Sequence, residues 1–174
     1  MTDTTLDKFR TVSQARGEVF DGYEGGIHCP VCNQFVKLYK RKLTSSMAYA
    51  LILIHWYFKN NPEEKWLHVE KYLKSIESVP HPIRGDFHKL RYWKLIEKKK
   101  GEKEDGNPDV GYYAITDKGK EFVEKKIQVP KHVYIYNSEV KGFNEDVEID
   151  IQNALGSKFQ YDELMLNNLE DENE

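Results

Sequence analysis

The sequence predicts an α+β fold, and three observations carry this prediction. One uninterrupted apolar run, residues 47–58 (MAYALILIHWYF), is typical of a buried helix. Apolar side chains then recur at helical spacing through 66–76 and 83–93. Two strand-like runs follow, and they flank a loop rich in Gly, Asn, Pro and Asp. Together these patterns predict several helices combined with small β-hairpins.

Composition limits the size and class of the protein. The 174 residues suit one main domain with small appendages, and 39% hydrophobic residues supply material for a core. The apolar run is shorter than the roughly 20 residues that a helix needs to cross a bilayer. The first ten residues, MTDTTLDKFR, contain no apolar signal core. We therefore expect a cytoplasmic globular protein.

The amino-terminal part predicts an arm followed by a hairpin. Residues 1–20 show no clear periodicity, so we expect a mobile or loosely packed arm there. The segment 21–43 alternates around a Cys-Pro-x-Cys turn, which predicts a β-hairpin. Phe35, Lys37 and Tyr39 fall on one side of its second strand.

Cys29 and Cys32 resemble one half of a zinc ribbon. Two thiolates at this spacing can hold one metal ion from a tight turn, and the residue after the second cysteine often adopts a left-handed conformation, which Asn33 tolerates. We therefore expect Zn²⁺ as a candidate cofactor with Cys29 and Cys32 as ligands. The alternative is a tight turn with two reduced thiols. A redox role is disfavoured because no predicted helix begins at Cys29 to lower its pKa.

Zinc needs four ligands, and the sequence holds no second cysteine pair. The two remaining ligands must come from histidines or from the same cysteine pair of another subunit. The candidate histidines are His28, His55, His68, His81, His88 and His132. His28 would need an awkward geometry because it is adjacent to Cys29.

Local signals bound the helices of the central part. Thr44 or Ser45 is expected to cap the helix that contains 47–58, and Asn61-Pro62 to end it. Its apolar residues lie nearly all round, so we expect it to be covered on several sides, with a dimer partner as one source of cover. For 65–69 (KWLHV), a short strand and the start of the next helix both remain open.

Residues 83–93 predict a third helix with one apolar and one cationic face. Ile83, Phe87, Leu90 and Trp93 fall on the apolar face. The opposite face and its edges carry Arg84, Gly85, His88, Lys89, Arg91 and Tyr92. A lysine-rich hairpin follows over 95–115, and Thr116-Asp117 is expected to cap the next helix.

The order helix, helix, helix, basic hairpin, helix resembles the winged helix-turn-helix of MarR- and PadR-type transcriptional regulators. LRYWKLIEKK and GYYAITDKGKEFVEKKI carry the resemblance, which covers about residues 44–128. In that family the second strand of the wing closes with Leu-Thr-x-x-Gly, and here Ile115, Thr116 and Gly119 occupy those positions. Small proteins of phage and prophage genomes also look similar, because they join a Cys-Pro-x-Cys hairpin to such a core.

The resemblance implies a transcriptional regulator that binds double-stranded DNA as a dimer. In the family the third helix enters the major groove, and the wing touches the backbone or the minor groove. Cationic side chains on both elements fit phosphate and base contacts, whereas Asp86 and the acidic EKEDG of the wing oppose tight binding. The DNA-binding residues expected from the resemblance are Arg84, His88, Lys89, Arg91, Tyr92, Lys98, Lys99, Lys100 and Lys103.

Two other classes of function are weighed against DNA binding. A winged-helix protein–protein interaction module, phage-encoded and bound to a host or partner protein, remains an alternative. An enzyme is not expected, because the sequence has no phosphate-binding Gly loop, Ser-His-Asp order or His-Glu-x-x-His motif. No small-molecule substrate is inferred.

The carboxyl-terminal part predicts an extension that packs on the core over 129–166. Alternation around Asn137-Ser138 predicts strands joined by a turn. Residues 147–156 are either a strand followed by a short helix or a single helix ended by Gly156. The acidic segment 167–174 is expected to be a disordered, solubilising tail.

Overall fold

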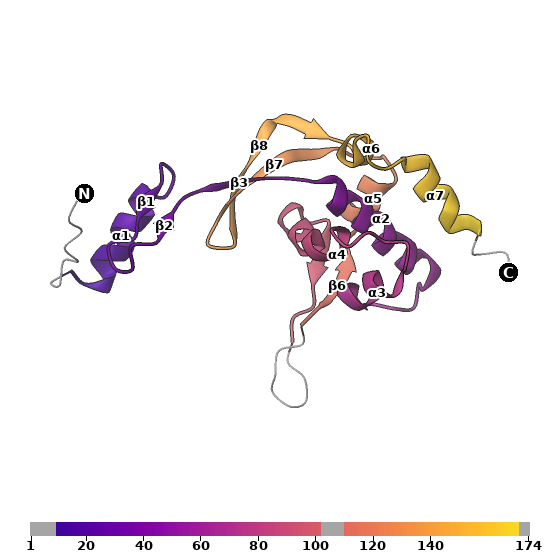
Figure 1. The fold of residues 1–174 in the computed structure, drawn as a ribbon, viewed down its shortest axis with the longest axis horizontal. Helices are drawn as coiled ribbons and strands as arrows, with labels where there is room; N and C mark the ends of the chain where they lie inside the picture. Colours follow the sequence, from indigo (N-terminus) through magenta and orange to yellow (C-terminus); the bar gives the residue numbers. More distant parts are fainter. Residues whose placement is uncertain (1–9, 102–109, 171–174) are drawn as a thin grey trace. The chain divides into compact units, whose positions relative to one another are not determined.

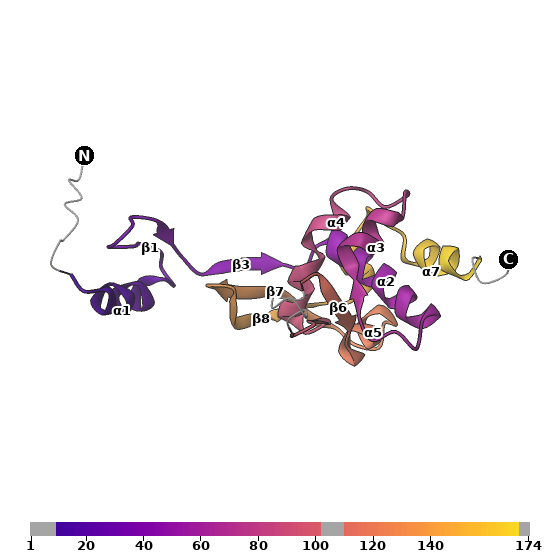
Figure 2. The same cartoon turned by 90° about the horizontal axis from the view of Figure 1, so that it is seen from below.

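The computed structural model describes residues 10–101 and 110–170 and has an α+β fold (Figures 1 and 2). The chain divides into two compact units, Met1–Arg41 with Val133–Phe143, and Lys42–His132 with Asn144–Glu174. The elements in chain order are α1 (Val12–Gly22), β1 (Ile27–His28), β2 (Phe35–Val36), β3 (Tyr39–Lys42), α2 (Ser45–Asn60), β4 (Leu67–His68), α3 (Val69–Ser75), α4 (Ile83–Asp86), the 3₁₀ helix η1 (Phe87–Trp93), β5 (Ile96–Lys98), β6 (Tyr112–Ile115), α5 (Asp117–Val123), β7 (Val129–Tyr136), β8 (Glu139–Ile149), α6 (Ile151–Leu155) and α7 (Tyr161–Glu170).

The first unit begins with helix α1, where the sequence predicted an irregular arm. Thr11 caps this helix: its hydroxyl accepts from the Gln14 N–H at 3.2 Å, and the Gln14 side chain accepts from the Thr11 N–H at 2.9 Å. This reciprocal arrangement is a capping box. The apolar periodicity of residues 12–22 is too weak to predict a helix, although its start signal, Thr11 with Gln14, is present in the sequence. Residues 1–9 of the predicted arm lie outside the described residues.

The predicted hairpin segment 21–43 contributes to two different sheets. β1 and β2 pair antiparallel, with Ile27 opposite Val36. β2 then ends, and β3 belongs to a separate sheet with strand order β3-β7-β8. The expectation that Phe35 and Tyr39 share one strand was therefore wrong. A partner strand some 90 residues away cannot be read from local alternation.

Helix α2 lies at the centre of the second unit (Figures 1 and 2). The Thr44 hydroxyl accepts from the Met47 N–H at 3.3 Å, and the helix ends at Asn60 with Asn61 as its C-cap, both as expected. Nine of its residues are buried, on all sides of the helix. Helices α4, α5 and α6 and the 3₁₀ helix η1 pack against it. Other elements of the same chain therefore bury the apolar surface of α2, for which the sequence had suggested a dimer partner as one source of cover.

A three-stranded sheet with the order β4-β6-β5 lies beside these helices. Leu67 and His68 pair with Tyr113 and Tyr112, so the start of 65–76 is a strand and not the first turn of a helix. On the other side of β6, Ile96 lies opposite Ile115. The loop between β5 and β6 falls largely outside the described residues.

Residues 83–93 form the short helix α4 followed by η1, where a single α-helix was predicted. The predicted apolar face is confirmed, because Ile83, Phe87, Leu90 and Trp93 are all buried. Phe87, Leu90 and Trp93 are three residues apart, and side chains at i and i+3 eclipse each other in a 3₁₀ helix. Burial of all three thus favours the 3₁₀ form over the α form.

The carboxyl-terminal segments resolve the alternatives left open by the sequence. Asn137 and Ser138 both have positive φ, of 49° and 63°, and form the turn between β7 and β8. β8 runs to Ile149, and Asp150 then caps the short helix α6. Helix α7 extends to Glu170, so residues 167–170 are helical and not part of a disordered tail. A helix already nucleated and packed is extended at little cost.

Helix α7 is tied to the core of the second unit near its start. The Tyr161 hydroxyl donates to the Val123 carbonyl at 2.8 Å, and the rings of Phe159 and Tyr49 lie 4.7 Å apart. Residues 171–174 lie outside the described residues. In the ranges 10–101 and 110–170, no helix is both long and apolar enough to cross a membrane.

Candidate functional site

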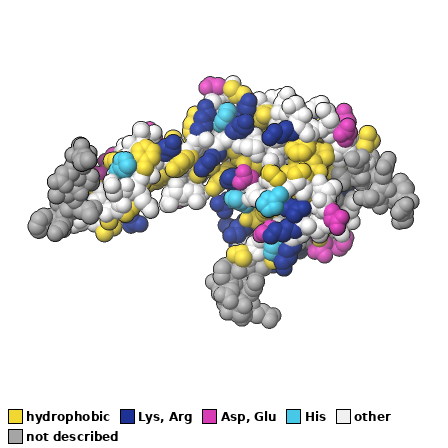
Figure 3. Space-filling model, viewed as in Figure 1, with side chains coloured by type: hydrophobic (Ala, Val, Ile, Leu, Met, Phe, Trp, Pro, Cys, Tyr) yellow, Lys and Arg dark blue, Asp and Glu magenta, His cyan; other side chains and the backbone are white. Residues whose placement is uncertain are grey.

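Cationic side chains gather around η1 and β5 in the second unit. Figure 3 shows Lys and Arg side chains on this side of the second unit. These elements pack on each other. We call this area the basic surface and define it by His88, Arg91, Tyr92, Lys94, Lys98, Lys99 and Lys100. Each of these side chains is exposed or half-exposed.

Two predicted DNA-binding residues are engaged within the chain. The Arg84 guanidinium donates from Nη2 to the Val79 carbonyl at 2.9 Å, and its Nε is buried without a hydrogen-bond partner among the described residues. Lys89 forms a salt bridge of 2.7 Å with Asp86. Arg84 therefore holds the turn before α4, and the charge of Lys89 is locally neutralised. Neither belongs to the basic surface.

The remaining polar residues of η1 face outward in restrained positions. His88 Nδ1 lies 3.0 Å from the Gly85 carbonyl oxygen. Because a carbonyl oxygen only accepts, Nδ1 carries the proton in this hydrogen bond, and Nε2 takes no part in it. The Arg91 guanidinium lies over the Tyr92 ring, 5.1 Å from its centroid. Stacking on an aromatic ring restricts the guanidinium while its N–H groups keep access to solvent.

The lysines at the end of β5 and directly after it point to different sides. Lys98 and Lys100 are exposed, whereas Lys99 is half-buried with its ammonium 5.2 Å from the Tyr112 ring centroid. Successive side chains of a strand point to opposite faces, which explains this division. Lys103, also predicted to bind DNA, lies outside the described residues.

The junction between η1 and β5 is held by a set of hydrogen bonds to three successive carbonyl groups. Lys118 Nζ donates to the Trp93 carbonyl at 3.1 Å, and the Thr116 hydroxyl lies 2.7 Å from the Lys94 carbonyl. The Thr116 N–H donates to the Leu95 carbonyl at 3.1 Å. These bonds fix the angle between the end of η1 and the start of β5, so the two parts of the basic surface are presented together.

Sequence reasoning missed Lys94 and Lys118. Lys94 ends η1 with a φ of 58° and is exposed. Burial is the main cause that lowers the pKa of Lys118, and the charge of Lys94 lowers it further. Lys94 was visible in the sequence as part of the basic run, but no pattern indicated that Lys118 on α5 would reach the end of η1.

The cysteine pair lies in the first unit, in the turn between β1 and β2. The Asn33 N–H donates to the Cys29 carbonyl at 2.8 Å, and Asn33 has a φ of 59°, which confirms the predicted left-handed conformation. The backbone N–H groups of Cys32 and Val31 donate to the Cys29 sulfur and lower the pKa of its thiol. Cys29 is half-buried and Cys32 is exposed.

Histidine does not complete this pair within the described ranges. His28 Nδ1 lies 3.1 Å from the Asn33 carbonyl, an acceptor that engages this nitrogen. Across residues 10–101 and 110–170, no three His, Cys, Asp or Glu side chains come together in a way that could hold a metal ion. The two thiols thus form a two-ligand group.

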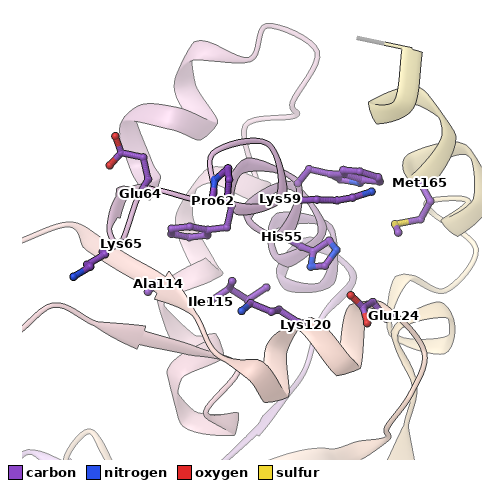
Figure 4. Close-up of a pocket in the computed structure, with 12 residues that line it drawn as sticks. His55, Lys59, Pro62, Glu64, Lys65, Ala114, Ile115, Lys120, Glu124 and Met165 are labelled. Atoms are coloured by element: carbon purple, nitrogen blue, oxygen red, sulfur yellow. The ribbon is translucent and has the colours of Figure 1, made fainter. Parts of the chain in front are cut away.

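A pocket of about 580 Å³ lies in the second unit between α2, β6, α5 and α7 (Figure 4). His55 and Trp56 of α2 line it and are only 8% and 3% exposed. The indole N–H of Trp56 is buried without a hydrogen-bond partner in the described part of the chain. Figure 4 shows the His55 ring lying between Lys59 and Glu124. The sequence indicated no pocket here, because its walls come from four separate elements.

His55 should make the stability of the second unit depend on pH. Burial is the main cause that lowers the pKa of His55 below its usual 6.5; Glu124 opposes this shift, and Lys59 and Lys120 add to it. Below about pH 6.5 the unfolded chain therefore binds a proton at this residue more readily than the folded chain, and the free energy of unfolding falls as pH decreases. We expect His55→Gln to flatten this fall below about pH 6.5, where His55 of the unfolded chain becomes protonated. Urea denaturation across that range measures it.

The matched control for this prediction is His81→Gln, because His81 is exposed. This variant should follow the wild-type dependence. Parallel curves for wild type and His55→Gln would contradict the prediction.

Comparisons with known proteins return nothing for this chain: no protein-family profile matches the sequence, and neither curated proteins nor solved structures match it. The geometry of the sites described above is therefore the basis for inferring function.

Proposed function

We propose that this chain binds double-stranded DNA through a winged helix formed by residues 44–123, and that it acts as a transcriptional regulator. The observation that carries the proposal is the connectivity of the second unit. Its order α2, β4, α3, α4 with η1, β5, β6, α5 and its strand order β4-β6-β5 are those expected of a winged helix-turn-helix.

The chemistry of the basic surface supports this proposal. Lysines and arginines that contact phosphates release counterions, a contribution to affinity that does not depend on sequence. Lys98 and Lys100 extend this charge from η1 onto the wing. On the helix side, nothing lies within 4 Å of the position that a Cβ would take at Gly85, so the backbone there is open to a close approach.

Base reading in this proposal rests on few side chains. Arg84 and Lys89 are held by the Val79 carbonyl and by Asp86, which leaves His88, Arg91 and Tyr92 on η1. Arginine that donates two hydrogen bonds to guanine is the commonest specific contact in the major groove. We therefore assign base recognition to Arg91 and phosphate binding to the wing lysines, and we expect most of the affinity to come from phosphates.

Duplex binding should weaken steeply as salt concentration rises. Plotted as the logarithm of affinity against that of salt concentration, the slope should become shallower by about 2 in the double variant Lys98→Ala/Lys100→Ala, because each lost phosphate contact removes about 0.9. Arg91→Ala should weaken binding about tenfold or more and relax sequence preference. Fluorescence anisotropy with a labelled duplex across a salt series measures both effects.

Lys126→Ala is the control, because Lys126 is an exposed lysine outside the basic surface that pairs with Glu124. It removes one positive charge and should leave the slope unchanged. If the folded chain does not bind duplex DNA at low salt, the proposal fails and the protein-interaction alternative takes its place. An unchanged slope in the double variant would remove the basic surface from the proposal.

A further inference from the structure

We propose that Cys29 and Cys32 form one half of a tetrahedral zinc site, and that the same two cysteines of a second copy of this chain form the other half. The inference concerns the first unit and does not depend on DNA binding by the second. Each of the four thiols would lose its proton to solvent, so that one Zn²⁺ is held by four thiolates with a net charge of −2.

The turn that carries the thiols is already shaped to hold a metal. The Cys29 N–H donates to the Gln34 carbonyl at 2.8 Å, and the Asn33 N–H donates to the Cys29 carbonyl, also at 2.8 Å. The N–H groups of Val31 and Cys32 reach the Cys29 sulfur, and the side chain of Cys32 also contacts it. Both sulfurs therefore lie on the same side of the turn.

The ligand count requires a second source of thiolate or imidazole. The chain has two cysteines and six histidines, and all eight lie among the residues that the structure describes. Within those residues no third His, Cys, Asp or Glu joins a metal-binding group. His28 is the one histidine next to the pair in sequence, and its Nδ1 faces the Asn33 carbonyl. Structural zinc sites are closed by four ligands, so a pair alone is incomplete.

A second copy is the occupant that the surroundings of the thiols favour. Val31 lies between the two cysteines in the turn, and its side chain is 53% exposed. In a two-fold symmetric contact each patch meets its own copy, so the two cysteine pairs converge and the two exposed Val31 side chains enter the same contact.

Metal stoichiometry and mass of the full chain test this inference. We expect the reduced protein, titrated with Co²⁺ as a visible probe, to develop tetrahedral thiolate absorption that saturates at one metal ion per two chains. With Zn²⁺, light scattering after size exclusion should give twice the 20.5 kDa of one chain, and a chelator should reverse this gain in mass. Cys29→Ser and Cys32→Ser should each abolish metal uptake and the zinc-dependent gain in mass.

Gln34→Ala serves as the control, because Gln34 contributes its backbone carbonyl to the turn and its side chain is exposed. This variant should bind metal as the wild type does. Saturation at one metal ion per chain, or no uptake by the reduced wild type, would overturn the inference. A dimer that persists in chelator would still support it if saturation at one ion per two chains and loss in both serine variants are found.

Discussion

Replacing Gly119 with alanine should lower the free energy of unfolding of the second unit by about 3 kcal/mol or more. Gly119 lies in α5 and is fully enclosed by its surroundings. A Cβ at this position would lie 2.1 Å from the Leu95 carbonyl oxygen and 2.8 Å from a side-chain carbon of Ile115. The nearest atom belongs to the backbone of the η1–β5 junction, so it cannot rotate away, and either α5 or β5 must move.

The same displacement should impair the basic surface. α5 begins at the Thr116 cap, whose hydroxyl also contacts the Lys94 and Leu95 carbonyls. A shift of α5 would break these contacts and change the angle between η1 and β5. We therefore expect Gly119→Ala to weaken the proposed duplex binding even at temperatures where the chain stays folded.

Gly85→Ala is the matched control for the effect on stability. Nothing lies within 4 Å of the position of its Cβ, and it lies in helix α4 of the same unit. Alanine there should be neutral or stabilising by about 0.5–1 kcal/mol. Denaturation followed by tryptophan fluorescence compares the two variants. Equal stability of Gly119→Ala and wild type would show that α5 does not approach the Leu95 backbone as described.

Truncating Trp93 should be the second large effect. Trp93 is completely buried at the end of η1, and its indole N–H donates to the Pro130 carbonyl at 2.6 Å. Trp93→Ala should cost about 3–5 kcal/mol through lost burial and the cavity that remains. Trp93→Phe keeps most of the apolar volume but leaves the Pro130 carbonyl without its donor, which should still cost about 1–3 kcal/mol.

Trp56 offers an internal control for the hydrogen bond. It is also buried, but its indole N–H has no hydrogen-bond partner in the described residues. Trp56→Phe therefore removes a similar volume without breaking a hydrogen bond, and it should destabilise the chain less than Trp93→Phe. Urea denaturation of both variants measures the difference. If the two variants were equally stable, the contact with Pro130 would contribute nothing to the fold.

Much of the candidate site could be predicted because its signals are local. The caps at Thr44 and Thr116, the apolar spacing of Ile83, Leu90 and Trp93, and the basic run after β5 each depend on residues a few positions apart. The left-handed Asn33 belongs to the same class, since a tight turn restricts the backbone whatever surrounds it.

Competition for side chains was harder to foresee. Lys89 and Arg84 carry the positive charge that a DNA groove would attract. However, Lys89 pairs with Asp86, and Arg84 donates to the Val79 carbonyl. The Asp86–Lys89 pair was open to prediction, because residues three apart are neighbours on a helix. The Arg84 contact was not, because it depends on how the loop before α4 returns toward the helix.

By itself, the sequence determined the caps at Thr44 and Thr116, which face of residues 83–93 is buried, and that two cysteines share one tight turn. Only the tertiary structure decided that β3 pairs with β7, that Gly119 must be a glycine, and that four elements enclose a pocket around His55. The physical reason is the distance along the sequence between the residues that interact. Caps, turns and amphipathic faces arise from neighbouring residues, whereas strand partners, close backbone contacts and pockets arise from segments brought together by the burial of apolar surface.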